Sequence, residues 1–147
     1  MRMSSFAGVM GGLKDEYIFK NGPVTGYSWA GQKTSYASYT TTGSALNASA
    51  QITPGEVEQG CFAKVYITVD VSKYRYIHFK VTGRTGSPSI SVGGTGVSST
   101  TGTKTLDISS MTGSKQIIIH SGTVTKMEEE GNVSSGITIS QVWLSNK

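Results

Sequence analysis

The sequence holds one cysteine, three prolines and only 15% charged residues among its 147 positions. A single cysteine excludes a disulfide within the chain and a zinc site built from several cysteines of one chain. We therefore expect Cys61 to be a small buried residue near the start of a strand at residue 62. A domain of this length can fold by burying apolar side chains, without covalent or metal crosslinks.

Long apolar runs and clustered basic residues are also missing. No apolar stretch approaches the roughly 18 residues of a membrane-spanning helix, so we expect no membrane partner. Residues 1–14 are interrupted by serine and glycine and lead to no small-residue cleavage site, so we do not expect a signal peptide. The formal net charge is +4, but lysine and arginine occur singly. Without a basic stripe interleaved with aromatic residues, we expect no nucleic-acid partner.

The short motifs of common catalytic sites are absent as well. There is no Gly-x-Ser-x-Gly elbow, and the glycine-rich run at residues 93–96 lacks the lysine and helix start of a phosphate-binding loop. His78 and His120 lack the close spacing of a metal pair, and Asp107 with residues 128–130 does not make the oxygen-rich loop that Ca²⁺ needs. No acidic pair stands out as the two carboxylates of a glycosidase. We therefore expect no metal, no cofactor and no enzymatic activity.

What the chain has in quantity is serine, threonine, glycine and alternating apolar positions. Threonine suits pleated strands, and the 19 glycines suit turns. Strict alternation over residues 62–71 and 76–82 predicts two strands, each with one buried face. Further strands are predicted at residues 17–20, 27–30, 46–52, 90–92, 103–108, 115–120 and 137–144, with an irregular strand within the polar segment 31–43. About nine strands predict one all-β domain over residues 15–147, an antiparallel two-sheet β-sandwich of jelly-roll type.

Two similar segments predict how strands in this sandwich end. Asp70 and Ser72 enclose a valine, and Asp107 and Ser109 enclose an isoleucine; a strongly β-prone run follows each segment. An aspartate or serine at a strand exit can hydrogen-bond the backbone two residues on and stop the ladder, while the aliphatic residue stays inside. The same device at corresponding places favours two packed sheets.

The last predicted strand contains an irregularity that determines where Trp143 points. Its apolar positions 137, 139, 142 and 144 share one face only if an extra residue sits near Ser140 and Gln141, as in a β-bulge. That register turns Trp143 outward. Because tryptophan is enriched in protein interfaces, we expect Trp143 to contact another subunit or the N-terminal segment. Burial in the core and stacking on a ligand are the alternatives.

The N-terminal 14 residues are apolar and glycine-rich but show no strand alternation. We interpret them as a docking segment that binds a neighbouring subunit, with packing along its own domain as the alternative. The interface residues expected in this segment are Met1, Met3, Phe6, Val9, Met10 and Leu13.

Two sets of aromatic side chains are candidates for glycan binding, since sugar faces stack on exposed rings. One set contains Tyr66, Tyr76 and His78, which point outward from predicted strands. Neighbouring strands of a jelly roll can belong to opposite sheets, so these three need not share a surface. The other set contains Tyr27, Trp29, Tyr36 and Tyr39 in a loop-rich region. Ordinary packing or contact with another subunit is the alternative for both sets.

Four segments at the ends of predicted strands also resemble segments of a known protein family. Residues 70–81 read DVSKYRYIHFKV, residues 106–119 read LDISSMTGSKQIII, residues 137–144 read ITISQVWL, and residues 17–22 read YIFKNG. Together they resemble the β-sandwich domains of tailed-phage and prophage structural proteins from gut Firmicutes, which are similar in shape to galactose-binding-like jelly rolls and carbohydrate-binding modules. The resemblance covers roughly residues 15–147, rests on structural motifs, and supplies no catalytic residues.

The resemblance implies a non-enzymatic component of a tailed-phage or phage-like virion, assembled in the bacterial cytoplasm. Such a chain would serve as a fibre, tail-tip or baseplate, or head-decoration subunit, bound to other virion proteins and to copies of itself. A small docking segment gains strength when it is repeated in a symmetric array. Contact with host-surface glycans is compatible with this role. The alternative function is a soluble extracellular carbohydrate-binding module that acts through aromatic stacking.

Overall fold

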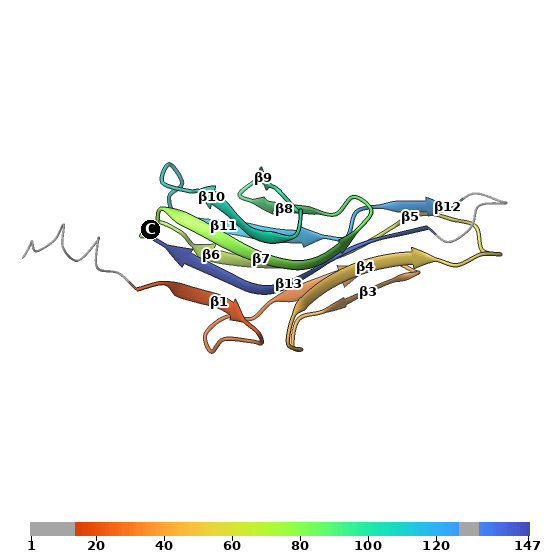
Figure 1. Cartoon of the computed structure of the whole chain (residues 1–147), viewed down its shortest axis with the longest axis horizontal. Helices are drawn as coiled ribbons and strands as arrows, with labels where there is room; N and C mark the ends of the chain where they lie inside the picture. Colours follow the sequence, from red (N-terminus) through yellow and green to blue (C-terminus); the bar gives the residue numbers. More distant parts are fainter. Residues whose placement is uncertain (1–13, 127–132) are drawn as a thin grey trace, which may run out of the picture.

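A computed structural model describes residues 14–126 and 133–147, and these residues form thirteen strands without a helix. In chain order the strands are β1 (Glu16–Lys20), β2 (Ala30–Lys33), β3 (Ala37–Thr40), β4 (Leu46–Ile52), β5 (Glu58–Cys61), β6 (Ala63–Asp70), β7 (Tyr76–Thr85), β8 (Ser89–Val92), β9 (Thr95–Val97), β10 (Gly102–Asp107), β11 (Ser114–His120), β12 (Val124–Lys126) and β13 (Val133–Ser145). The domain is elongated along its strands, with β1 and the carboxyl end of β13 at one end and β5 and β12 at the other (Figure 1).

Two antiparallel sheets pack face to face, which confirms the predicted sandwich. The six-stranded sheet has the order β10-β7-β13-β4-β3, with β1 also paired to β13; the five-stranded sheet has the order β2-β6-β11-β8-β9. Strands β4, β6, β7, β8, β10, β11 and β13 alternate between the two sheets along the chain, which is the jelly-roll arrangement. A small third sheet of β5 and β12 closes one end.

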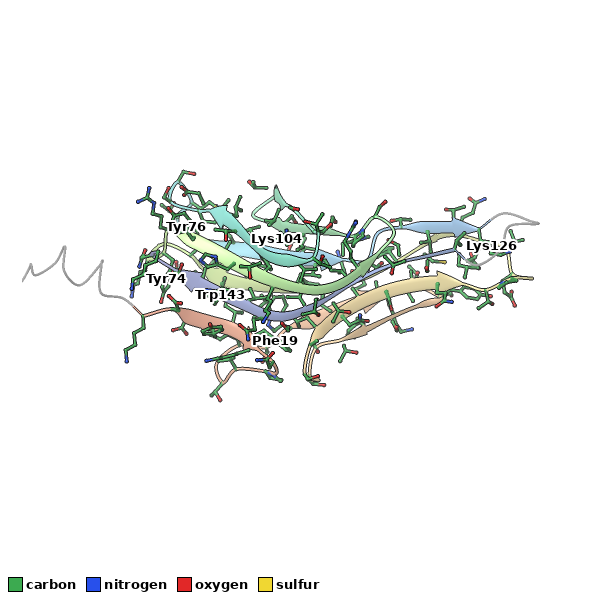
Figure 2. All side chains as sticks on the ribbon, in the orientation of Figure 1. Phe19, Tyr74, Tyr76, Lys104, Lys126 and Trp143 are labelled. Carbon is green, nitrogen blue, oxygen red and sulfur yellow. The ribbon has the colours of Figure 1, made fainter. Side chains whose placement is uncertain are left out.

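The core lies between the facing sides of the two large sheets and follows the predicted alternation. Val65 of β6 and Ile77 and Phe79 of β7 are fully buried, while their sequence neighbours point away from the core. Phe19 of β1 adds the other large buried ring (Figure 2). A second apolar cluster under the small sheet contains Cys61, which is 2% exposed, so its prediction as a small buried residue is confirmed.

The two aspartate–serine turns form as predicted. The backbone N–H of Ser72 donates to Asp70 Oδ1 over 2.9 Å, and that of Ser109 donates to Asp107 Oδ1 over 2.8 Å. The Ser109 hydroxyl adds a second bond to the same oxygen at 2.6 Å. Because these bonds favour the ionised carboxylate, they hold the pKa of each aspartate below its ordinary value. The first turn follows β6 of one sheet and the second follows β10 of the other.

The predicted bulge in the last strand is also confirmed. Ile139 of β13 pairs with Val81 of β7, but Gln141 pairs with the next residue, Lys80, so Ser140 is the extra residue. A second irregularity lies beside it, where the partner of Thr138 is Gly83 rather than Thr82. With the Ser140 bulge in place, Val142 and Leu144 are buried and Trp143 points out of the core.

The prediction of nine strands was too low, and one predicted strand was wrong. The additional strands β2, β5, β9 and β12 are three or four residues long and lack a continuous apolar alternation. Residues 27–29 are not in a strand. The N–H of Tyr27 instead donates to Val24 O over 3.1 Å in a turn, and the Trp29 indole donates to Ile18 O over 3.2 Å. Tyr27 is thus held by a backbone turn and Trp29 by its side chain, and neither residue takes part in a strand ladder.

Candidate binding surface on the six-stranded sheet

One surface of the domain has two regions, which follow each other along strand β13. We call this surface the outer face: the side of the six-stranded sheet that points away from the five-stranded sheet. Strand β7 runs along one side of β13 over most of its length. On the other side, β13 pairs with β4 through Val133–Ile139 and with β1 through Gln141–Leu144. The outer face therefore has one region over β4, β13 and β7 and another over β1, β13 and β7.

The region over β1 carries a row of stacked rings. Tyr17, Trp143 and His78 are direct cross-strand partners on β1, β13 and β7. The centroids of Tyr17 and Trp143 lie 5.5 Å apart at 25°, and those of Trp143 and His78 lie 4.9 Å apart at 21°. Tyr76 continues the cluster, with its centroid 6.2 Å from that of His78. We call these four residues the aromatic row; all four are half-buried.

Hydrogen bonds hold the imidazole of His78 in this stack. Its Nδ1 lies 2.8 Å from Thr105 Oγ1, and its Nε2 lies 2.6 Å from Ser145 Oγ. Hydroxyl groups can donate or accept, so they satisfy the neutral ring in either tautomer. Burial lowers the pKa of His78 below 6.5, and the charge of Asp15 opposes that change only in part. The imidazole of His78 is therefore mainly neutral at neutral pH.

Two basic groups flank the aromatic row. Lys20 Nζ lies 4.5 Å from the centroid of Tyr17, and Arg75 Cζ lies 5.5 Å from that of Tyr76. Cations over ring faces are attracted by the ring quadrupole. Aromatic side chains with arginine nearby are also enriched at protein interfaces. This end of the outer face thus offers a contact area that is apolar at its centre and cationic at its rim.

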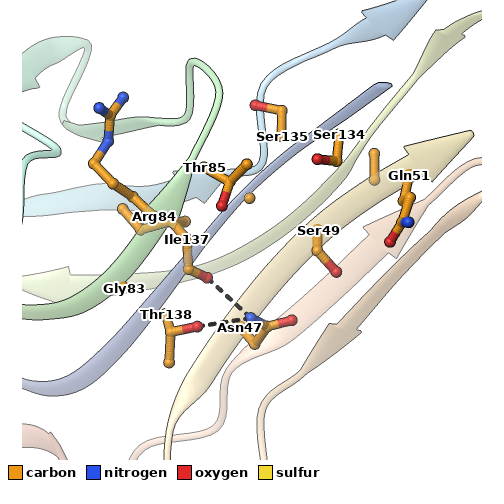
Figure 3. A pocket seen from close by; sticks show the side chains of 12 residues that line it. Asn47, Ser49, Gln51, Gly83, Arg84, Thr85, Ser134, Ser135, Ile137 and Thr138 are labelled. Atoms are coloured by element: carbon orange, nitrogen blue, oxygen red, sulfur yellow. Dashed lines mark hydrogen bonds between the residues drawn. The ribbon is translucent and has the colours of Figure 1, made fainter. Parts of the chain in front are cut away.

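The region over β4 contains a polar groove of about 430 Å³ (Figure 3). This volume falls within the range of small-molecule sites. The residues that line it are Asn47, Ser49, Ala50, Gln51, Gly83, Arg84, Thr85, Ser134, Ser135, Gly136, Ile137 and Thr138. Strand pairing orders them into rows: Thr85, Gly136 and Ser49 are cross-strand neighbours, as are Gly83, Thr138 and Asn47. The polar side chains of β4 alternate with buried Leu46, Ala48, Ala50 and Ile52 and therefore belong to the outer face.

Side chains and glycines give the groove its shape. Asn47 donates to Ile137 O over 3.2 Å and to Thr138 Oγ1 over 2.9 Å, which fixes its amide beside the groove (Figure 3). Gly136 is buried between Ser49 and Thr85, and a Cβ there would lie 2.9 Å from that of Ser49. Gly83 has room for a Cβ, whose nearest neighbour would be Thr138 Cβ at 4.0 Å. The missing side chain at Gly136 lets β4 pack closely against β13, whereas the missing side chain at Gly83 leaves open space in the groove.

An exposed tyrosine stands beside the groove. Tyr36 lines an adjoining hollow of about 280 Å³ that shares Ser49 and Gln51 with the groove. Its backbone has a φ of 61°, a left-handed conformation that is uncommon for a residue with a bulky side chain. The Tyr36 hydroxyl donates to Glu56 Oε2 over 2.9 Å, and this bond raises the pKa of the phenol. Tyr36 as a whole residue is 39% exposed.

The four predicted aromatics of residues 27–39 do not form one platform. Tyr27 donates to Glu16 Oε2 over 2.8 Å, and burial together with this bond raises its pKa to about 12. Tyr27 and Trp29 pack against the main core and line a small cavity of about 160 Å³. Tyr39 lies over Gly31 of the other sheet. Tyr36 alone of this set borders the polar groove.

The other predicted aromatic set is divided between the two sheets. Tyr76 and His78 lie on β7 and belong to the aromatic row. Tyr66 lies on β6 of the five-stranded sheet, next to Ile118 of β11, with Lys64 Nζ 5.6 Å from its ring centroid. Tyr66 therefore points to the opposite side of the sandwich and cannot act together with Tyr76 and His78.

The predicted interface residues are described only in part. Met1, Met3, Phe6, Val9, Met10 and Leu13 lie outside the described residues. Trp143 does point outward, but its neighbours are Tyr17 and His78. Tyr17 was not predicted as an interface residue, because its pairing with Trp143 joins the first and last strands and leaves no local signal in the sequence. The groove was not predicted either, although the alternation of residues 46–52 does place Asn47, Ser49 and Gln51 on one face.

Within the described residues, no three His, Cys, Asp or Glu side chains come together in a way that could hold a metal ion. The same part of the chain has no helix with the length and apolar character to cross a membrane. No protein-family model, curated protein or solved structure matches this chain.

Proposed function

We propose that this chain is a non-enzymatic structural subunit of a tailed-phage or phage-like virion. In this role it is assembled in the bacterial cytoplasm and forms part of a fibre, tail tip, baseplate or head decoration. The observation that supports the proposal most is the half-buried aromatic row on the outer face, centred on Trp143. Rings that remain partly exposed on a sheet are costly in isolation and are useful where another chain covers them.

The partner that we propose for the aromatic row is a second copy of the chain, in an assembly with other virion proteins. The described residues begin at Lys14, two residues before β1, and β1 carries Tyr17 of the row. The proposed docking segment is therefore attached next to the row. Each contact is small, and repetition in a symmetric array supplies the strength. Lys20 and Arg75 stand at the rim of this contact, over the rings of Tyr17 and Tyr76.

The test is the solution mass of four chains, measured by light scattering after size exclusion. They are the full chain, a chain without residues 1–14, Trp143→Ala and Lys20→Glu. We expect a defined oligomer for the full chain and a lower mass for the other three. Lys20→Glu reverses an exposed charge and leaves the core intact, so it stays informative if Trp143→Ala unfolds.

The matched control is Tyr66→Ala, which removes a half-buried ring from the opposite side of the sandwich. It should keep the mass of the full chain. If the full chain is a monomer at all concentrations, the assembly proposal fails. If only Tyr66→Ala dissociates the oligomer, assembly uses the five-stranded sheet and the assignment to the aromatic row is wrong.

A second candidate function, a soluble extracellular carbohydrate-binding module, is favoured by a different observation. The polar groove presents hydroxyl and amide groups from β7, β13 and β4 around an open floor. Such groups match the hydroxyls of a sugar, and the groove is separate from the aromatic row. A virion subunit could also use the groove to hold host-surface glycans, so the two functions are compatible. Retention on immobilised polysaccharide is the simplest test of this candidate.

A further inference from the structure

The chemical character of the groove limits the class of ligand that it can bind. Its outward side chains are hydroxyls and amides from Asn47, Ser49, Gln51, Thr85, Ser134 and Thr138. Among the described residues that line it, Arg84 alone carries a charge. The Arg84 side chain extends away from Asn47 and Ser49 (Figure 3), and its guanidinium donates to Gly86 O over 2.9 Å. The charged group therefore faces Gly86, just after the end of β7, instead of the groove.

One row of residues in the groove runs across the strands, from β7 to β3. Thr85, Gly136, Ser49 and Ser38 are successive cross-strand neighbours on β7, β13, β4 and β3. Three strand spacings amount to roughly 14 Å, which is longer than one sugar ring. Tyr36 lies at the β3 end of this row, immediately before that strand. A ligand that follows the row would cross β13 at Gly136, which carries no side chain, and reach the Tyr36 ring.

Tyr36 is held in place before any ligand binds. Its hydroxyl is bonded to Glu56, and its carbonyl accepts the N–H of Gln51 over 2.9 Å. The left-handed backbone at Tyr36 is an observed strain in an exposed residue, and such strain is found preferentially at binding sites. A fixed, exposed ring loses little side-chain entropy when a sugar stacks on it.

We propose that the groove binds an uncharged oligosaccharide across the strands, with one sugar ring stacked on Tyr36. The inference rests on the second candidate function, carbohydrate binding, and adds the class of saccharide and the residue that positions it. Hydroxyl and amide groups of Asn47, Ser49 and Thr138 exchange hydrogen bonds with the sugar hydroxyls. Gly83, where an added Cβ would meet no atom nearer than 4.0 Å, lets the sugar approach the backbone. Among the described residues that line the groove, the one cation, Arg84, is turned toward Gly86 O, so charge gives acidic saccharides no advantage there.

The test is a glycan array that carries neutral and acidic oligosaccharides, followed by calorimetry with the tightest neutral binder. Two variants probe the site. Tyr36→Gly removes the ring at a backbone conformation that glycine adopts without strain. Gly83→Val fills the floor at a strand position with room for a Cβ. Each should weaken binding roughly ten-fold, the scale of one lost stacking or packing contact. Thr103→Val on β10, exposed and outside the groove, is the control and should bind as the native chain does.

The outcomes separate this inference from the function it rests on. Binding of neutral oligosaccharides that both variants weaken supports it. If only acidic saccharides bind, and salt abolishes that binding, carbohydrate binding stands but the class is wrong; Lys20 and Lys80, which pair with Gln141 on the same face, become the site. If neutral saccharides bind Tyr36→Gly and Gly83→Val unchanged, the groove is not the site. If no saccharide binds, both the inference and the second candidate function fail.

Discussion

Trp143 of β13 and His78 of β7 are direct cross-strand partners whose rings stack with centroids 4.9 Å apart. The pair lies next to the bulge at Ser140, which turns Trp143 toward the outer face. Hydroxyls of Thr105 and Ser145 hold the imidazole in the orientation that stacking requires. A stacked pair in the middle of a sheet should stabilise the fold as well as shape a surface.

The contribution of this pair can be measured by a double-mutant cycle with Trp143→Ala and His78→Ala. We expect Trp143→Ala to lower the free energy of unfolding by about 2–4 kcal/mol, because it removes half-buried area and two ring contacts. The coupling energy with His78→Ala should be about 0.5–1.5 kcal/mol. Urea unfolding followed by circular dichroism measures all four chains. A coupling energy of zero would show that the stacked geometry adds nothing beyond burial.

Stability should also depend on pH through the two histidines. Burial lowers the pKa of His78 and His120 below 6.5, and the nearby charge of Lys64 lowers that of His120 further. The unfolded chain therefore takes up protons at a higher pH than the folded chain. The two histidines leave stability at its full value above about pH 6.5, the ordinary pKa of histidine. This contribution is lost as the pH falls from there through the lowered pKa values of the folded chain.

Urea unfolding at pH values of about 7.5 and 5.5 tests this dependence. We expect the native chain to be less stable at the lower pH, and His78→Gln to lose less on the same change. His120→Gln should behave similarly, because His120 stacks on Phe62 and accepts the N–H of Gly122. A native chain that gains stability on acidification through this range would contradict the prediction.

Gly31 is required by the ring that covers it. A Cβ at this position would overlap the Tyr39 side chain, while the backbone of Gly31 does not have the positive φ that would itself demand glycine. Gly31→Ala should therefore lower the free energy of unfolding by about 1–3 kcal/mol through steric conflict alone. The same substitution in a Tyr39→Ala background should cost much less. Thermal or urea unfolding of the four chains gives the comparison.

Gly96 of β9 provides the matched control for this substitution. It is also a strand glycine without a positive φ, but a Cβ there would meet no atom within 4 Å. Gly96→Ala should be neutral or slightly stabilising, because alanine restricts the unfolded chain. Equal losses for Gly31→Ala and Gly96→Ala would mean that the Tyr39 ring is not the cause.

A substitution at the bulge residue Ser140 should make the domain more stable. Its hydroxyl is buried and has no hydrogen-bond partner within the described part of the chain, whereas its carbonyl accepts the N–H of Asn21 over 2.7 Å. Ser140→Ala keeps the backbone bond and removes an unsatisfied polar group, so it should raise the free energy of unfolding by about 1 kcal/mol. Ser110→Ala, at an exposed turn residue, should change it by less than about 0.5 kcal/mol. A loss of stability in Ser140→Ala would show that the hydroxyl is satisfied in solution.

The parts of the fold that were predictable from the sequence are those whose determinants are local. Alternation in residues 62–71 assigns the buried face of β6 because one side of that strand packs in the core. The spacing of apolar residues in β13 requires the bulge at Ser140, because only that register buries Val142 and Leu144. The turn at Asp107 depends on contacts within three residues.

The parts that were not predictable depend on partners far away in the chain. Strand β2 is short and mostly exposed, and its residues pair with β6 only because the sandwich brings the edge of the five-stranded sheet to them. Tyr17 and Trp143 meet because the first and last strands are neighbours. The polar groove is assembled from small residues of three strands, each of which resembles ordinary solvent-facing positions when taken alone.

The pairing of β1 with β13 has a mechanical consequence. Glu16 pairs with Leu144 and Lys20 with Gln141, so residues 14 and 147 leave the sheet at the same end. A force that pulls these two residues apart would act across the ladder and break its bonds one after another, starting beside Trp143. Load applied between residue 14 and a distant loop would instead strain several of these bonds together. The domain should therefore resist tension well in one attachment geometry and peel open easily in the other.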